Sequence, residues 1–236
     1  MSAAVNDART RSHPFTLVSA LLASARFLNH TRDFNGGIEA TEEGFAIAAE
    51  QRSPYHLSRA SILRAVNLIN GDRHEEGIAQ MERALEAHRK TGANYQSSYN
   101  QSYLALAHAR AGDIERALEI SAQAVDEVER SGERWWEAEA HRLKGEICLM
   151  AVPALRDEAE VCFRRALECA RLKHAKLWEL HAAQSLAKLW STENRHERTR
   201  DLLAAVYGQF TEGFDLPALK EAKELLDRLS DPTRVL

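Results

Sequence analysis

Small side chains recur along this chain of 236 residues at a nearly constant interval of 40 residues. They form three parallel series, and each member of the third is followed by a large apolar side chain. The series are Ala25, Ala65, Ala105, Gly145 and Ala187, then Gly37, Gly77, Ala117, Ala159 and Thr199, and finally Gly44, Ala84, Ala124, Ala166 and Val206. A fixed period of this length is typical of a solenoid, whose repeats bury their apolar faces against their neighbours.

The small residues predict a pair of α-helices in each repeat, because small side chains at a helix crossing let two backbones approach while larger neighbours fill the groove. We expect the first series on the first helix of each pair and the other two series on the second. No segment shows the sustained period-2 alternation of a strand. The sequence therefore predicts an all-α fold, a right-handed α-solenoid of about five helix-turn-helix units with a capping helix at the C-terminal end.

Turn signals between the apolar segments predict the limits of these units. We expect units at residues 15–53, 54–93, 94–133, 134–175 and 176–213, a capping helix at 214–229, and flexible segments at 1–14 and 230–236. The interval lengthens once, by two residues, between Gly145 and Ala159. Pro153 lies in that stretch, so we expect one enlarged turn there.

Several segments also carry a family resemblance. The order of small residues resembles the tetratricopeptide (TPR) pattern, although a period of 40 exceeds the usual 34 of that family. The segments that carry the more specific resemblance are 132–146 (GERWWEAEAHRLKGE), 163–168 (FRRALE), 207–217 (YGQFTEGFDLP) and 219–223 (LKEAK). Together they resemble the C-terminal repeat region of bacterial multidomain proteins that join a class III adenylate or guanylate cyclase domain to a signal-transduction ATPase. The resemblance implies a regulatory TPR module in, or derived from, cyclase–ATPase signalling.

Composition narrows the range of partners. The net charge is −4 with both signs interspersed, which disfavours nucleic acid as a partner. The most apolar stretch near the N-terminus, residues 15–28, is too short and too charged to span a bilayer, and no signal peptide precedes it. Three cysteines without close-paired spacing favour neither a disulfide framework nor a zinc site. We therefore expect a cytoplasmic protein with no nucleic-acid or membrane partner.

Residues able to carry chemistry are scattered, so we expect no catalytic site, no metal and no cofactor. There is no P-loop motif and no His-Glu-x-x-His motif. Cys148 and Cys162 could approach each other across one helix pair, but buried cysteines usually act as small hydrophobic side chains. Glu139, His141 and Glu146 lie on one helix with Arg142 and Lys144, a mixture typical of solvent-facing ion pairs. Trp135 and Trp136 are expected to fill a junction between units rather than to stack on a ligand.

The surface that we expect to bind a partner is the concave one, which the first helices line in a TPR-like stack. Tyrosine and arginine are enriched where binding energy concentrates, and both occur in the middle of the expected groove. Counting outward from the first series of small residues gives the expected groove residues: Arg26, Asn29, Arg59, Tyr99, Ser102, Tyr103, Leu106, Arg110, Glu139, Arg142, Glu146, His181, Gln184 and Lys188. A protein or peptide in this groove is the predicted partner.

Three hypotheses for function remain at this point. The first is a non-enzymatic scaffold that binds a protein or peptide in the groove. The second is a small-molecule sensor whose ligand enters near Trp135, Tyr99 and Arg142, and the third is a detached fragment of a cyclase-type protein without its catalytic domain. Because no polar cap precedes Phe15, the first helix is also expected to meet a partner, or a second copy in a homodimer, at the N-terminal end.

Overall fold

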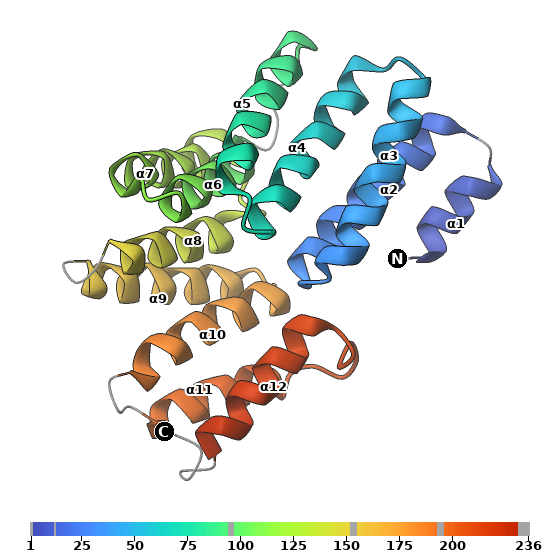
Figure 1. The fold of residues 1–236 in the computed structure, drawn as a ribbon. Coiled ribbons are helices and arrows are strands. Elements are labelled where there is room, and N and C mark those ends of the chain that lie inside the picture. The colour runs from blue at the N-terminus through green and yellow to red at the C-terminus, as the bar shows by residue number, and fades with distance from the viewer. Residues whose placement is uncertain (1, 12, 94–96, 152–154, 193–195, 231–236) are drawn as a thin grey trace. The chain divides into compact units, whose positions relative to one another are not determined.

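A computed structural model describes residues 2–11, 13–93, 97–151, 155–192 and 196–230. All regular structure in these residues is α-helical, in agreement with the predicted all-α fold (Figure 1). The twelve described helices are α1 (Ser2–Thr10), α2 (Pro14–His30), α3 (Phe34–Glu50), α4 (Pro54–Asn70), α5 (His74–Lys90), α6 (Ser97–Arg110), α7 (Ile114–Ser131), α8 (Glu137–Met150), α9 (Arg156–Leu172), α10 (Lys176–Ser191), α11 (His196–Tyr207) and α12 (Pro217–Ser230).

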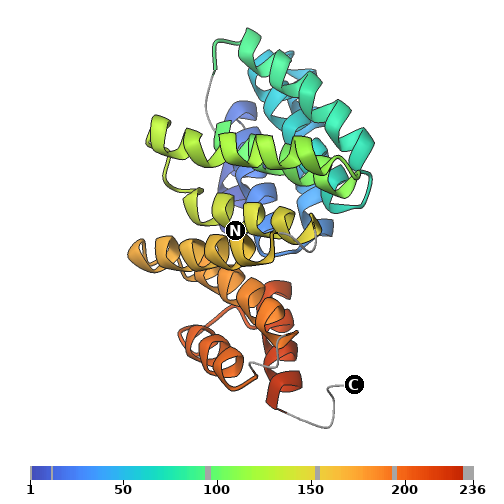
Figure 2. The same cartoon turned by 90° about the vertical axis from the view of Figure 1, so that its left-hand side faces the viewer.

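The chain divides into two compact units. Unit 1 comprises Met1–Asp113 and contains α1 to α6, and unit 2 comprises Ile114–Leu236 and contains α7 to α12. The division falls in the turn between α6 and α7, which is the middle of the expected third repeat at 94–133. In unit 1, α2 packs on α3 and α4 on α5; in unit 2, α8 packs on α9 and α10 on α11. In both Figures 1 and 2, α9 and α10 lie side by side within unit 2.

The period of 40 residues is visible in the helix boundaries, and the solenoid of helix pairs is confirmed. The second helices α3, α5 and α7 begin at residues 34, 74 and 114, each after a turn of three residues. The middle residue of each turn, Arg32, Asp72 or Gly112, has a positive φ, which allows the sharp reversal between the helices. α8 ends at Met150 and α9 begins at Arg156, so two more residues separate these helices than separate α2 from α3. The predicted two-residue slip is thus located, whereas Pro153 itself lies outside the described residues.

The small residues stand where helices of a pair approach closely. Ala25, Ala65 and Ala105 are fully buried. A Cβ atom added to Gly77 would lie 2.6 Å from Ile69 Cγ1, and one added to Gly145 would lie 2.6 Å from Phe163 Cε1. The absence of a side chain at these two glycines therefore allows the two helices of a pair to approach closely.

The N-terminal end of the chain differs from the expectation, and the C-terminal end agrees with it. Residues 2–10 were expected to be flexible but form the helix α1. This helix is held in place because it packs on α2 and its side chains Val5 and Ala8 are buried. The ion pair between Arg9 and Glu43, at 2.6 Å, also holds α1 to α3. The expected capping helix is present as α12, whose buried Leu219 and Ala222 belong to the core formed with α10 and α11. Residues 231–236 lie outside the described part. Among the described helices, none has the length and apolar character needed to cross a membrane.

Candidate functional site

The first helices of unit 1, which are α2, α4 and α6, are linked through side chains of the expected groove set. The amide nitrogen Nδ2 of Asn29 donates to Oδ1 of Asn67 at 2.9 Å and joins α2 to α4. Nη1 of Arg110 donates to the carbonyl oxygen of Ile69 at 2.9 Å and joins α6 to the C-terminal end of α4. These hydrogen bonds hold the three helices together, as the packing of a solenoid requires.

Aromatic rings and arginines lie together on α4 and α6, and a further arginine reaches them from α2. The rings of Tyr99 and Tyr103 lie 5.0 Å apart, and both side chains are buried. The guanidinium of Arg26 lies 5.4 Å from the centre of the Tyr99 ring, and that of Arg59 lies 5.4 Å from the centre of the Tyr55 ring. Both distances are within the range of a cation–π interaction. The rings thus provide surfaces over which two guanidinium groups are held.

In unit 2 the expected groove residues form a buried ionic network between α8 and α10. Nε and Nη2 of Arg142 each donate to one oxygen of Glu139 at 2.8 Å, and Nη1 donates to Glu146. Nδ1 of His181 lies 3.3 Å from Oε1 of Glu139, and Ser185 donates to Glu146 at 3.4 Å. The network connects the two first helices by charge-assisted hydrogen bonds.

The electrostatics of Glu139 oppose a role in proton transfer. Burial by itself would raise the pKa of its carboxyl, but Arg142 and His181 outweigh burial and hold the pKa far below its usual range. A carboxylate paired in this way stays ionised and cannot act as a general acid near neutral pH. The arrangement therefore favours a structural role for Glu139, His181 and Arg142.

The structure places the other expected groove residues as follows. Gln184 Nε2 donates to the carbonyl oxygen of Ala218 at 3.3 Å and thereby joins α10 to α12, while Ser102 donates to the carbonyl oxygen of Ser98 within α6. Leu106 is buried. Of the whole set only Arg110 and Lys188 are exposed, and three members are intermediate, namely Arg26, Arg59 and Glu146. That these residues contact a partner stays a prediction, and the accessible part of the set is narrower than the sequence alone indicates.

Cavities lie elsewhere in the described residues. In unit 2 a cavity of about 780 Å³ is lined by α9, α10 and α11. At its wall the guanidinium groups of Arg164 and Arg198 lie 5.2 and 4.8 Å from the centre of the Trp190 ring. Smaller cavities of about 330 and 260 Å³ lie in unit 1. None of these three cavities is lined by an expected groove residue. The signal missed in the sequence was Trp190, which follows the small residue Ala187 by one helical turn.

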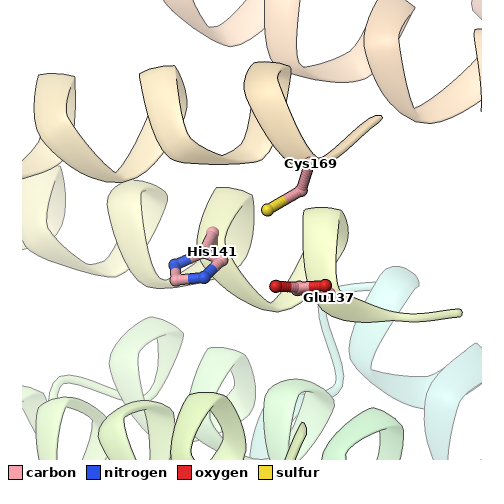
Figure 3. Close-up of side chains that lie close together, drawn as sticks. All are labelled: Glu137, His141 and Cys169. Atoms are coloured by element: carbon pink, nitrogen blue, oxygen red, sulfur yellow. The ribbon is translucent and has the colours of Figure 1, made fainter. Parts of the chain in front are cut away.

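The seam between α8 and α9 brings together side chains that could ligate a metal. Figure 3 shows the first group, in which Glu137 and His141 lie one turn apart on α8 and Cys169 faces them from α9. Lys173 donates to Glu137, and Arg134 lies 3.4 Å from it. Burial alone would raise the pKa of Glu137, but Lys173 and then Arg134 lower it. Burial, reinforced by the charge of Arg165, lowers the pKa of His141.

A second group on this seam consists of Cys148, Glu158 and Cys162. The Cys148 thiol is hydrogen-bonded to the sulfur of Cys162, which raises the pKa of Cys148 and lowers that of Cys162. The approach of these two cysteines across a helix pair, considered from the sequence, is thus realised. The i, i+4 spacing of Glu158 and Cys162 was a signal that could have placed the carboxylate beside them.

Of the two tryptophans that precede α8, Trp136 lies where the sequence predicts, whereas Trp135 is exposed and does not fill a junction between units. Trp136 is fully buried, with its ring edge-on to Trp178 at 5.5 Å between centroids. Trp135 is partly exposed, and its ring lies 5.3 Å from that of Trp136. Trp136 fills a junction between helices, in agreement with the reading of an aromatic packed between units.

Comparison with known proteins concerns the fold. The crystal structure of BtubC (BKLC) from P. vanneervenii matches with a TM-score of 0.56 and 19% identity, over 90% of this chain and 91% of that chain. The Rap protein complexed with Competence and Sporulation Factor matches with a TM-score of 0.57 and 14% identity, over 90% of this chain but only 63% of that chain. The TPR2AB domain of yeast Sti1 in complex with pHSP90 gives a TM-score of 0.37 and 12% identity, over 92% and 99% of the two chains.

No protein-family model matches the chain, and no curated protein matches it significantly. Identities this low carry information about architecture and not about activity. The helix pairs, their period and the first two structural matches lead to the same result. By fold, this chain is a TPR-like helical-repeat protein.

Proposed function

We propose that the chain is a non-enzymatic module that binds an acidic segment of a protein or peptide on the first-helix face of unit 1. One observation carries this proposal. The helices α2, α4 and α6 contain no aspartate or glutamate, although together they contain four arginines. The carboxylates of unit 1 lie instead on α1, α3 and α5 and in the turns.

Three of the four arginines belong to the expected groove set. Arg26 and Arg59 lie over tyrosine rings, and Arg110 reaches the end of α4, whereas the fourth, Arg64, forms an ion pair with Glu42 on α3. Guanidinium groups recognise carboxylates through two parallel hydrogen bonds, and tyrosine rings beside them supply rigid apolar surface. The positive face therefore complements a segment rich in aspartate and glutamate with apolar residues between them.

Structural similarity adds limited support. The structure of the Rap protein matches 90% of the present chain, and it contains that protein in complex with Competence and Sporulation Factor. A helical-repeat fold of this kind can thus hold a bound molecule. Resemblance of residues 132–146 to cyclase-associated repeats supports a regulatory role in cyclase or ATPase signalling. The proposal also includes a location in the cytoplasm and a homodimer formed through the N-terminal end.

The test uses two labelled peptides of equal length, one with alternating glutamate and leucine and one with alternating lysine and leucine. We expect fluorescence anisotropy to detect binding of the acidic peptide and a loss of affinity with added salt. Replacing Arg26, Arg59 and Arg110 by glutamine should weaken binding by about 3- to 150-fold, since each ion pair near the surface contributes roughly 0.2–1 kcal/mol.

The matched control replaces Arg83, Arg89 and Lys90 by glutamine, because it removes the same number of positive charges from the second helix α5 of the same unit. This control should bind the acidic peptide as the unmodified chain does. Equal binding of the two peptides, or an equal loss in the control, would contradict the proposed site. Melting curves of all variants establish that a loss of binding does not reflect unfolding.

A second candidate function rests on the cavity of 780 Å³ in unit 2. Its volume falls within the range of small-molecule sites, and Trp190 with Arg164 and Arg198 provides a ring and two guanidinium groups at its wall. A small-molecule sensor would use this cavity rather than the surroundings of Trp135. Thermal-shift screening of carboxylates and nucleotides, repeated on Arg198→Gln, tests this candidate, since a ligand of the cavity should lose its stabilising effect in that variant.

A further inference from the structure

Two cysteines and a glutamate converge between the helices α8 and α9 in unit 2. The ligand atoms of Cys148, Glu158 and Cys162 all lie within 4.8 Å of one another. Glu158 and Cys162 are one turn apart on α9 and share a face, and Cys148 meets them from the last turns of α8. From this geometry we propose that the three side chains bind a zinc ion, which joins α8 to α9.

The donor set matches the coordination chemistry of zinc. Thiolate sulfur binds zinc at about 2.3 Å and carboxylate oxygen at about 2.0–2.2 Å, so a tetrahedral site separates its donor atoms by about 3.6–3.8 Å. The three donor atoms lie within 4.8 Å of one another, so changes in side-chain torsion angles that move them by about 1 Å would bring them to this separation. Three protein ligands leave the fourth position to water, as in the class of zinc sites that keep an open coordination position.

Access and charge also favour the ion. Both thiols are buried, while the side chain of Glu158 is 45% exposed and provides a path from solvent. Two thiolates and one carboxylate carry three negative charges. Within the part of the chain that the structure describes, the cation in contact with them is Lys144, whose Nζ lies 3.3 Å from Oε1 of Glu158. A divalent cation neutralises the remaining two charges.

The neighbouring group of Glu137, His141 and Cys169 lacks this balance of charge. Lys173 and Arg134 already contact Glu137, and Arg165 lies close enough to act on both His141 and Cys169. Three cations around three donor atoms oppose the entry of a divalent ion. This second group therefore serves as an internal control, because it contains the third cysteine of the chain on the same helix pair.

The experiment measures zinc binding to the full chain, freed of metal by a chelator and kept reduced by a phosphine. We expect one equivalent of zinc in competition with a chromophoric chelator, and an ultraviolet thiolate-to-cobalt band when cobalt replaces zinc. Cys148→Ser and Cys162→Ser should each abolish both signals, whereas Cys169→Ser should retain them. Zinc should also raise the melting temperature of the unmodified chain and of Cys169→Ser.

Glu158→Gln keeps the proposal testable if a buried cysteine variant fails to fold, because the Glu158 side chain faces solvent. It should weaken zinc binding about tenfold or more, since even the loss of an outer-shell partner costs about that much. Absence of stoichiometric zinc binding to the reduced chain would overturn the proposal. So would binding that survives in both Cys148→Ser and Cys162→Ser, or binding that is lost in Cys169→Ser.

Discussion

Replacing Gly145 by alanine tests whether the recurring small residues act through close helix contact. A Cβ atom at this position would lie 2.6 and 2.8 Å from two ring carbons of Phe163 and 3.1 Å from the carbonyl oxygen of Ala159. Phe163 is fully buried, and the carbonyl belongs to the α9 backbone, so neither can move without cost. Alanine favours the helix by about 1 kcal/mol, whereas overpacking a core costs about 1–3 kcal/mol.

The steric cost falls in the upper part of that range, about 2–3 kcal/mol, because the added Cβ atom would crowd three atoms at once. After the gain in helix propensity of about 1 kcal/mol, we expect the free energy of unfolding of unit 2 to fall by about 1–2 kcal/mol. All four tryptophans, Trp135, Trp136, Trp178 and Trp190, lie in unit 2, so tryptophan fluorescence reports the unfolding of this unit. With a urea dependence of about 2 kcal/mol per molar, in the middle of the usual range, the midpoint should fall by roughly 0.5–1 M.

Two controls accompany this measurement. In Gly44→Ala, the nearest contact is the end of the Leu22 side chain at 3.1 Å in unit 1, so the tryptophan transition should not move. In Gly145→Ala combined with Phe163→Leu, the ring that crowds the new methyl group is gone, and the two effects should not add. A midpoint that stays constant or rises in Gly145→Ala, or the same penalty in the absence of the ring, would refute the reasoning from close packing.

Three further predictions concern unit 2 and use the same fluorescence signal. Arg142→Met should destabilise the unit by about 3–5 kcal/mol, because it leaves the Glu139 carboxylate buried without its main partner. Adding Glu139→Gln should recover part of this loss. A change in the free energy of unfolding below about 1 kcal/mol would contradict a structural role for the network. The pKa of His141 is lowered on folding, so the unfolded chain binds more protons and stability should fall as the pH drops below the ordinary histidine value of 6.5. His141→Gln should flatten this dependence in urea titrations between pH 8 and 5.5, and an unchanged slope would show that His141 does not cause it. Deleting residues 215–236 removes Leu219 and other buried leucines of α12, which should cost about 5 kcal/mol or more or cause aggregation; an unchanged melting temperature would contradict its role as a cap.

The sequence predicted which helices carry the expected groove residues, but it did not predict how many of their side chains are buried. Counting from Ala25 and Ala105 placed Arg26 and Asn29 on α2 and Arg110 on α6, and both of these first helices pack against α4. Their partners could not be counted in the same way. The hydrogen bond from Asn29 to Asn67 depends on how far α2 is shifted along α4, which a repeat period does not specify.

Regularity along the chain was enough to determine the repeat, the helix pairs, the place where two extra residues separate α8 from α9, and the C-terminal cap. These features are local, because a small residue every 40 positions and a polar turn between apolar segments act on nearby backbone. The tertiary structure decided the rest: the helix at residues 2–10, the division into two units, the burial of Tyr99 and His181, and the meeting of Cys148 with Cys162. Each of these depends on which side chains of neighbouring helices face one another, and that is set by packing between segments and not by the pattern within either one.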